Sequence, residues 1–185
     1  MKLDRKKALD ILTEYTKSES LLKHAFAVEQ AMKSYAQKFG EDIEKWSVTG
    51  LLHDFDYEMF PSSSEHPYKG VEILKEKGVE EDILKAILGH ADYANSPRDS
   101  LMAKTLFAVD ELCGFIMACG YVRPDRKISN IELKSVKKKL KDKSFARGVN
   151  REDIEKGIEE LGVDRDEHIQ FVINSLSEIE DTLMG

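Results

Sequence analysis

Histidine and aspartate side chains recur at inward-facing positions of this 185-residue chain; they are His24, His53, Asp54, His66, His90 and Asp110. An ionised aspartate such as Asp110, deep in an apolar helix, is costly to bury unless it is paired or bound to a cation. Imidazole and carboxylate ligands without sulfur suit iron, manganese, zinc, nickel or cobalt. Carboxylates also bridge paired metals, which suit hydrolytic phosphoryl chemistry. The set therefore indicates a centre with one or two divalent metal ions.

Each of these residues has a simpler interpretation when it is taken alone. A single histidine on a helix face is usually a satisfied, half-buried residue, and an isolated His-Asp pair arises by chance. The prediction therefore depends on the whole set, because bundle cores commonly hold metals with side chains from several facing helices. His168 has no acidic partner at ligand spacing, and we predict that it is structural.

Other polar residues lie near this set along the chain. Asp56 and Glu58 closely follow the His-Asp pair; they orient water and act as acid or base, or they belong to a solvated acidic loop. Lys104 lies about two turns before the buried aspartate and could approach a bound phosphate. Glu111 is a candidate for a supporting role beside that aspartate. We take Asp54, Asp56 and Lys104 as candidate catalytic residues.

A basic segment spans residues 123–147 and leaves two interpretations open. It supplies phosphate contacts, or it is a solvated helix face, which is the commoner fate of such a run. Some of its charges must point outward, because Leu133, Val136 and Leu140 already form its inner stripe. The cations concerned are Arg123, Lys134, Lys137, Lys138 and Arg147.

The elements that would position these side chains are helices. Apolar residues recur at helical spacing in segments 8–15 and 21–39, and no segment alternates as a strand does. Gly40 predicts a helix end, and Asn150 and Asp164 predict helix starts. Ser129 with Glu132 is typical of a capping box. We therefore predict an all-α bundle of about five core helices, with a metal-binding core in residues 1–120 and a helical extension in 121–185.

Composition excludes several classes of protein. The chain is 41% apolar and 34% charged, which excludes collagen-like and low-complexity chains. Its net charge of −7 argues against a dedicated duplex-DNA binder. Cys113 and Cys119 lie six positions apart on one predicted helix, out of disulfide reach. The charged N-terminus and the absence of a long apolar run predict no signal peptide, no membrane span and a cytoplasmic setting.

The order of the motif residues resembles a known signature. His24, then His53-Asp54, then Asp110 is similar to the H…HD…D series of the HD-domain superfamily of metal-dependent phosphohydrolases, over roughly residues 20 to 120. The resemblance implies a bundle of about five helices in which these residues bind a metal. It further implies that His66 and His90 bind a second metal, that Asp54 bridges the two, and that a water or hydroxide attacks the phosphorus.

No substrate-defined branch of that superfamily fits. The Gly-Tyr-Pro signature is absent, no lysine follows the His-Asp pair, and Tyr57 stands where one branch has a glutamate. We expect a phosphohydrolase acting on a nucleotide or another small phosphate ester or anhydride. The alternative is a nucleotide-binding or regulatory module that keeps its metal but has little turnover. Nucleic-acid binding through the basic segment is less favoured, and the formation of a homo-oligomer is left open.

Overall fold

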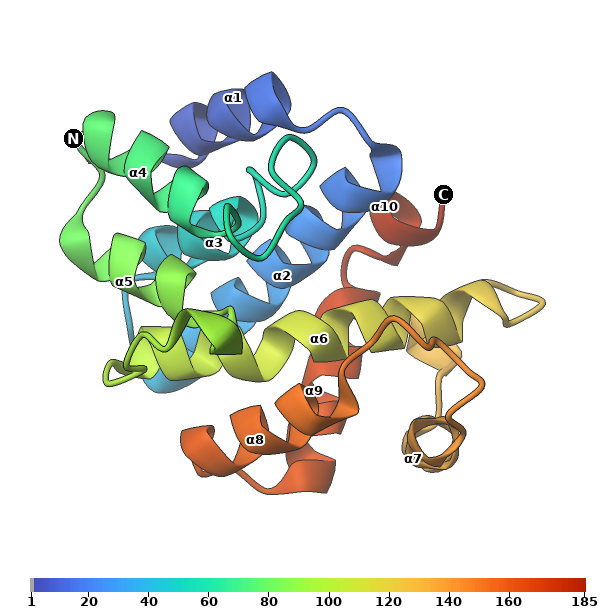
Figure 1. Cartoon of the computed structure of the whole chain (residues 1–185). Helices are drawn as coiled ribbons and strands as arrows, with labels where there is room; N and C mark the ends of the chain where they lie inside the picture. The colour runs from blue at the N-terminus through green and yellow to red at the C-terminus, as the bar shows by residue number, and fades with distance from the viewer. Residues whose placement is uncertain (1) are drawn as a thin grey trace.

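The computed structural model describes residues 2–185, and within that range it contains helices and no strand (Figure 1). The predicted all-α fold is confirmed. Its α-helices are α1 (Arg5–Tyr15), α2 (Glu19–Phe39), α3 (Ile43–Leu52), α4 (Tyr68–Glu76), α5 (Glu81–Gly89), α6 (Leu101–Tyr121), α7 (Leu133–Lys141), α8 (Arg151–Leu161), α9 (Arg165–Ser177) and α10 (Glu180–Met184). Two short 3-10 helices are η1 (Asp92–Ala94) and η2 (Ile128–Asn130).

The two longest helices, α2 and α6, form the centre of the molecule, with 21 residues each. In Figure 1, α6 crosses the middle, with α1 to α5 on one side and α7 and α8 on the other. Helix α3 packs on α2, α5 on α6, and α8 on the far side of α6. Apolar residues cover almost the whole circumference of α6, as is typical of a helix buried on all sides.

Helix α3 lies unusually close to α2 because of a glycine. A Cβ atom on Gly50 would lie 2.8 Å from the carbonyl oxygen of Val28 and 3.0 Å from Cγ of Met32. Only a residue without a side chain allows the two backbones to approach this far. His53 follows one turn later, at the C-terminal end of α3, so this contact brings it next to α2.

Most helix boundaries follow the local signals of the sequence. Gly40 ends α2 in the left-handed conformation, and the side chains of Asn150 and Asp164 cap the starts of α8 and α9, as predicted. The predicted capping box at Ser129 is wrong. Ser129 lies in η2, and both its backbone N–H and its hydroxyl donate to the carboxylate of Glu180, so α7 begins later. A contact with a distant residue replaced the local cap.

The C-terminal helices pack directly on the N-terminal ones. Helix α9 contacts both α2 and α6, and α10 returns to α2. His168 on α9 is 1% exposed; its Nε2–H donates to the carbonyl of Ala108 at 2.8 Å, and its Nδ1 accepts from the hydroxyl of Tyr35. The structural role predicted for His168 is thus confirmed. The division of the chain at residue 120 remains a prediction.

Two further predictions concern the whole chain. Cys113 and Cys119 are both buried and free, as their spacing predicted. Within residues 2–185, no helix combines the length and the apolar character that crossing a membrane requires.

Candidate metal centre

The candidate ligands come from separate helices and converge between α2 and α6. His24 lies in the second turn of α2, and Asp110 lies halfway along α6. His53 and His90 occupy the C-terminal ends of α3 and α5. His66 lies shortly before α4. Because helices or their ends, rather than loop tips, carry His24, His53, His90 and Asp110, the packing of the bundle fixes the positions of these four side chains.

The first group of ligands consists of His24, His53, Asp54 and Asp110, whose ligand atoms all lie within 4.8 Å of one another. Oδ1 of Asp110 lies 2.9 Å from Nε2 of His24 and 3.1 Å from Nε2 of His53. The two imidazole Nε2 atoms are 3.2 Å apart. Oδ2 of Asp54 completes the group at 3.3 Å from Nε2 of His53.

The second group consists of Asp54, His66 and His90, with the same 4.8 Å limit between ligand atoms. Oδ1 of Asp54 lies 3.2 Å from Nε2 of His66 and 3.0 Å from Nε2 of His90. The two carboxylate oxygens of Asp54 therefore face different groups, since Oδ2 faces His53. This is the arrangement in which one carboxylate bridges two cations.

Hydrogen bonds at the opposite ring nitrogen orient three of the imidazoles. Nδ1 of His53 lies 2.7 Å from the carbonyl oxygen of Gly50, and Nδ1 of His90 bonds to the carbonyl of Ile87. A carbonyl only accepts, so each Nδ1 carries the proton. Nδ1 of His66 is held by a carboxylate in the same way. In the neutral rings the lone pair is therefore on Nε2 and points into the centre, as metal-ligating histidines require.

The electrostatics of the centre are dominated by this contact of imidazoles with carboxylates. Burial opposes a charge on His53, but Asp54 and Asp110 outweigh it and hold the pKa of this imidazole well above its usual value. Burial likewise works against ionised Asp54, and the neighbouring histidines, His53 first, lower its pKa well below the usual range. The pKa of His66 is raised to about 9, against burial, by hydrogen bonds to Asp54 and Asp56.

These contacts are a test of whether the residues fit a metal. If His53 and His90 are neutral, their Nε2 lone pairs face carboxylate oxygens, and two acceptors at about 3 Å repel each other. A proton or a cation between them removes the conflict. Imidazole nitrogen with carboxylate oxygen, and no sulfur, is a donor set for divalent transition metals. The residues therefore fit one or two such ions.

A pocket of about 280 Å³ opens over the centre. Five of the candidate ligands line it, His53 lying beneath them at 0% exposure. The remaining lining residues are Tyr57, Ala91, Asp92, Tyr93, Glu111, Gly114 and Asp153. No lysine or arginine is among them. A bound phosphate would therefore meet imidazoles and any bound metal ion, but no lysine or arginine, in this lining.

The acidic residues after the His-Asp pair face away from the pocket. Asp56 is 1% exposed; its Oδ1 lies 2.8 Å from Nδ1 of His66, and its Oδ2 accepts from the N–H of Gly70 at 2.9 Å. Glu58 accepts from the N–H groups of Lys17 and Ser18, where α2 begins. Asp56 therefore supports a ligand, and Glu58 caps a helix. Neither interpretation given from the sequence, acid–base chemistry or a solvated loop, anticipated these contacts.

The predicted cations do not reach the pocket. Lys104 lies on α6 but is not among the lining residues, so its role in catalysis stays a prediction without a supporting contact. In the basic segment, Lys137 pairs with Asp166 at 2.9 Å. Lys134 and Lys138 line a separate surface hollow with no candidate ligand in its lining. These contacts favour the interpretation of the segment as a solvated face.

Sequence reasoning missed part of the pocket wall. Asp153 comes from the first turn of α8, far from the motif in sequence. Glu111 lines the pocket beside Asp110 and accepts the N–H of Asn150 at 3.0 Å. Burial raises the pKa of Glu111 to about 7 and raises that of Asp153 as well. Glu111 was considered from the sequence only as a support for Asp110, and no local pattern marks Asp153 as part of a site.

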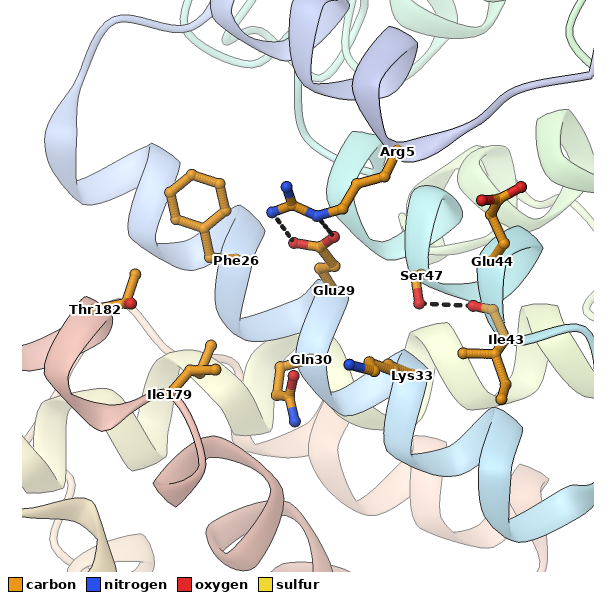
Figure 2. A pocket seen from close by; sticks show the side chains of 10 residues that line it. All are labelled: Arg5, Phe26, Glu29, Gln30, Lys33, Ile43, Glu44, Ser47, Ile179 and Thr182. Carbon is orange, nitrogen blue, oxygen red and sulfur yellow. Dashed lines mark hydrogen bonds and ion pairs between the residues drawn. The ribbon is translucent and has the colours of Figure 1, made fainter.

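A larger cavity of about 540 Å³ lies elsewhere, between α1, α2, α3 and α10 (Figure 2). No histidine lines it, and Arg5 and Glu29 are already joined there at 2.6 Å and 3.1 Å. Figure 2 shows Phe26, Ile43 and Ile179 around the opening. It lies on the face of α2 opposite His24, since positions 24 and 26 are about 200° apart. We assign no catalytic chemistry to it.

Comparison with known proteins agrees with this geometry. The family model of the HD domain matches residues 21–114, which is half of the chain. Two curated relatives, both named Ribonuclease Y, from Nitratidesulfovibrio vulgaris strains DP4 and Hildenborough, are 31% identical over 101 residues. The match covers 52% of this chain but only 18% of each relative. No solved structure matches the chain significantly.

Proposed function

Because the chain belongs to the HD-domain family, whose members are generally metal-dependent phosphohydrolases, we propose that it hydrolyses a small phosphate ester or anhydride. One observation carries the proposal: the ligand atoms of six side chains converge in two groups that share Asp54. A nucleotide remains within this substrate class. Iron, manganese, nickel, cobalt or zinc suits the donor set.

The residues of the two groups would divide the work as follows. His24, His53 and Asp110 would hold one ion, His66 and His90 the other, and Asp54 would contact both. When bound, divalent ions lower the pKa of water and neutralise charge on the phosphoryl group. Hydrogen bonds at Nδ1 keep the Nε2 lone pairs of His53, His66 and His90 directed inward.

Elemental analysis of the purified protein tests the metal centre. We expect wild type to retain metal in stoichiometric amount and His53→Ala and Asp110→Ala to lose most of it. Asp99→Asn is the control, because Asp99 is exposed and outside the pocket. If all four proteins carry the same trace of metal, the assignment of the ligands is wrong.

A substrate panel tests the reaction. It should include phosphate monoesters and diesters, nucleotides, cyclic dinucleotides and dinucleoside polyphosphates, with manganese, iron, nickel or cobalt. RNA belongs in the panel because the matched relatives are named as ribonucleases. Metal-dependent release of phosphate or of an alcohol that His53→Ala abolishes is the expected result. Metal binding without hydrolysis of any compound would refute the proposed activity.

A second candidate is a metal-retaining module that binds its ligand with little turnover. The absence of lysine and arginine from the pocket lining favours it, because these side chains commonly stabilise a transferring phosphoryl group. It predicts that a ligand raises the melting temperature of the metal-loaded protein while remaining intact. Analysis of the recovered ligand separates this outcome from hydrolysis.

A further inference from the structure

The lining of the pocket over the candidate metal centre has two chemically different parts. One part consists of the candidate ligands, where two divalent ions would bring four positive charges against the carboxylates of Asp54 and Asp110. The other part includes Glu111, which follows Asp110 on α6, and Asp153 on α8. A ligand in the pocket would therefore meet positive charge at the metal ions and carboxylates beside them.

The carboxylates of Glu111 and Asp153 lack a cationic partner. Neither forms an ion pair among the described residues, and the hydrogen bond to Glu111 comes from the neutral N–H of Asn150. The nearby cations are already bound elsewhere: Arg98 and Lys156 both contact Asp92 at 2.9 Å. Partly buried carboxylates without a partner are costly, so a cation brought by a ligand would stabilise them.

The volume and the lining of the pocket restrict the class of ligand further. A volume of about 280 Å³ is at the small end for ligand sites, which run from about 300 to 1,000 Å³. Tyr57 and Tyr93, 41% and 50% exposed, add aromatic surface to the lining. Aromatic faces attract cations, quaternary ammonium groups included. A highly charged polyphosphate would instead be repelled by the carboxylates of Glu111 and Asp153 in the lining.

We propose that the substrate is a small phosphate ester whose alcohol part carries a positive charge, with Glu111 and Asp153 as the residues that select it. The inference rests on the proposed function, because the metal ions must hold the phosphate end. It goes beyond that function by naming the substrate class and the role of α8.

The probes are phosphocholine and its uncharged carbon isostere, 3,3-dimethylbutyl phosphate. They share shape and phosphate and differ in the positive charge. Calorimetric titration into the manganese-loaded protein, in mildly alkaline buffer, should show tighter binding of phosphocholine by about tenfold, the size of effect that one moderate ionic contact gives. In Asp153→Asn this ratio should fall towards one, and in Glu111→Gln it should also decrease.

Glu152→Gln is the matched control, because Glu152 lies in the same first turn of α8, is exposed, and is not in the pocket lining. It removes the same charge and should preserve the ratio. Equal binding of both esters by wild type, or of neither, would overturn the inference while metal binding still supports the proposed function. A protein that binds no manganese overturns both. An equal fall of the ratio in the control also refutes the assignment to Asp153.

Discussion

Substituting Asp56 by asparagine should disable one half of the metal centre without touching a ligand. The Asp56 carboxylate accepts from Nδ1–H of His66 at 2.8 Å and from the N–H of Gly70 at 2.9 Å. Asparagine has the same shape but only one acceptor. If its oxygen keeps the bond to Gly70, its NH₂ faces His66 and must donate to Nδ1. The ring proton then moves to Nε2, and the lone pair needed for a metal is lost.

The size of the effect follows from the two bonds. Loss of a partner that orients a ligating histidine typically costs about 10- to 100-fold in metal affinity. Loss of a charge-assisted hydrogen bond in a buried site costs about 1.5–3 kcal/mol of stability. We therefore expect Asp56→Asn to fold, to keep metal at the group of His24, His53 and Asp110, and to bind it about 10- to 100-fold more weakly at the other group.

The assay is calorimetric titration of the metal-free protein with manganese, together with elemental analysis. Glu58→Gln is the matched control, because it removes the same charge from the same loop but caps only α2. In the double variant with His66→Gln, the loss of metal affinity should be no larger than in His66→Gln alone, because both substitutions remove the same ligand atom, Nε2 of His66. Additive losses, or metal binding of Asp56→Asn equal to wild type, would refute the reasoning.

Three further outcomes are expected. Gly50→Ala should lower the free energy of unfolding by about 1–3 kcal/mol in denaturant titration, because its Cβ would lie 2.8 Å from the Val28 carbonyl oxygen; an unchanged midpoint would contradict the close approach. Burial lowers the pKa of His168 below 6.5, and the nearby charge of Lys38 lowers it further. The hydrogen bond to the Ala108 carbonyl opposes this shift, and the Tyr35 hydroxyl is the other partner of the ring. The neutral ring therefore stabilises the fold fully above pH 6.5, and this contribution is lost as the pH falls through the lowered pKa. The difference in unfolding free energy between wild type and His168→Gln should therefore shrink on acidification. A difference that stays constant with pH would contradict a lowered pKa of His168. Removing metal with a chelator should lower the melting temperature, and manganese should restore it in wild type but not in a ligand variant; identical melting with and without chelator would speak against metal binding to the folded state.

The inward position of four candidate ligands was predictable because regular helices or their ends carry them. His24 and Asp110 lie on the inward faces of α2 and α6, so helical periodicity alone placed them towards each other. His53 and His90 end apolar helices, and a helix end in a core has a narrow range of positions. Their convergence to about 3 Å agrees with what the residue order and the family resemblance implied.

Asp56 and Ser129 make contacts that sequence reasoning did not anticipate. Asp56 was interpreted as a catalytic group or as part of a solvated loop, and Ser129 as a helix cap. In the structure, Asp56 turns towards the start of α4, and Ser129 bonds to Glu180, 51 residues away. Side chains of this kind choose among many nearby partners, and tertiary packing decides which partner is in reach.

The position of Asp153 in the pocket lining was not predictable for a related reason. Asp153 reaches it only because α8 lies directly on α6, where a Cβ on Gly157 would be 2.7 Å from Cα of Ala108. Helix α8 is outside residues 21–114, the segment that matches the HD domain. The matched segment therefore carries the candidate ligands, whereas Asp153, one of the two carboxylates proposed to select the substrate, lies beyond it. If Asp153 selects the substrate as proposed, a change in the helix packed on α6 would alter the choice of substrate while every candidate metal ligand stays the same.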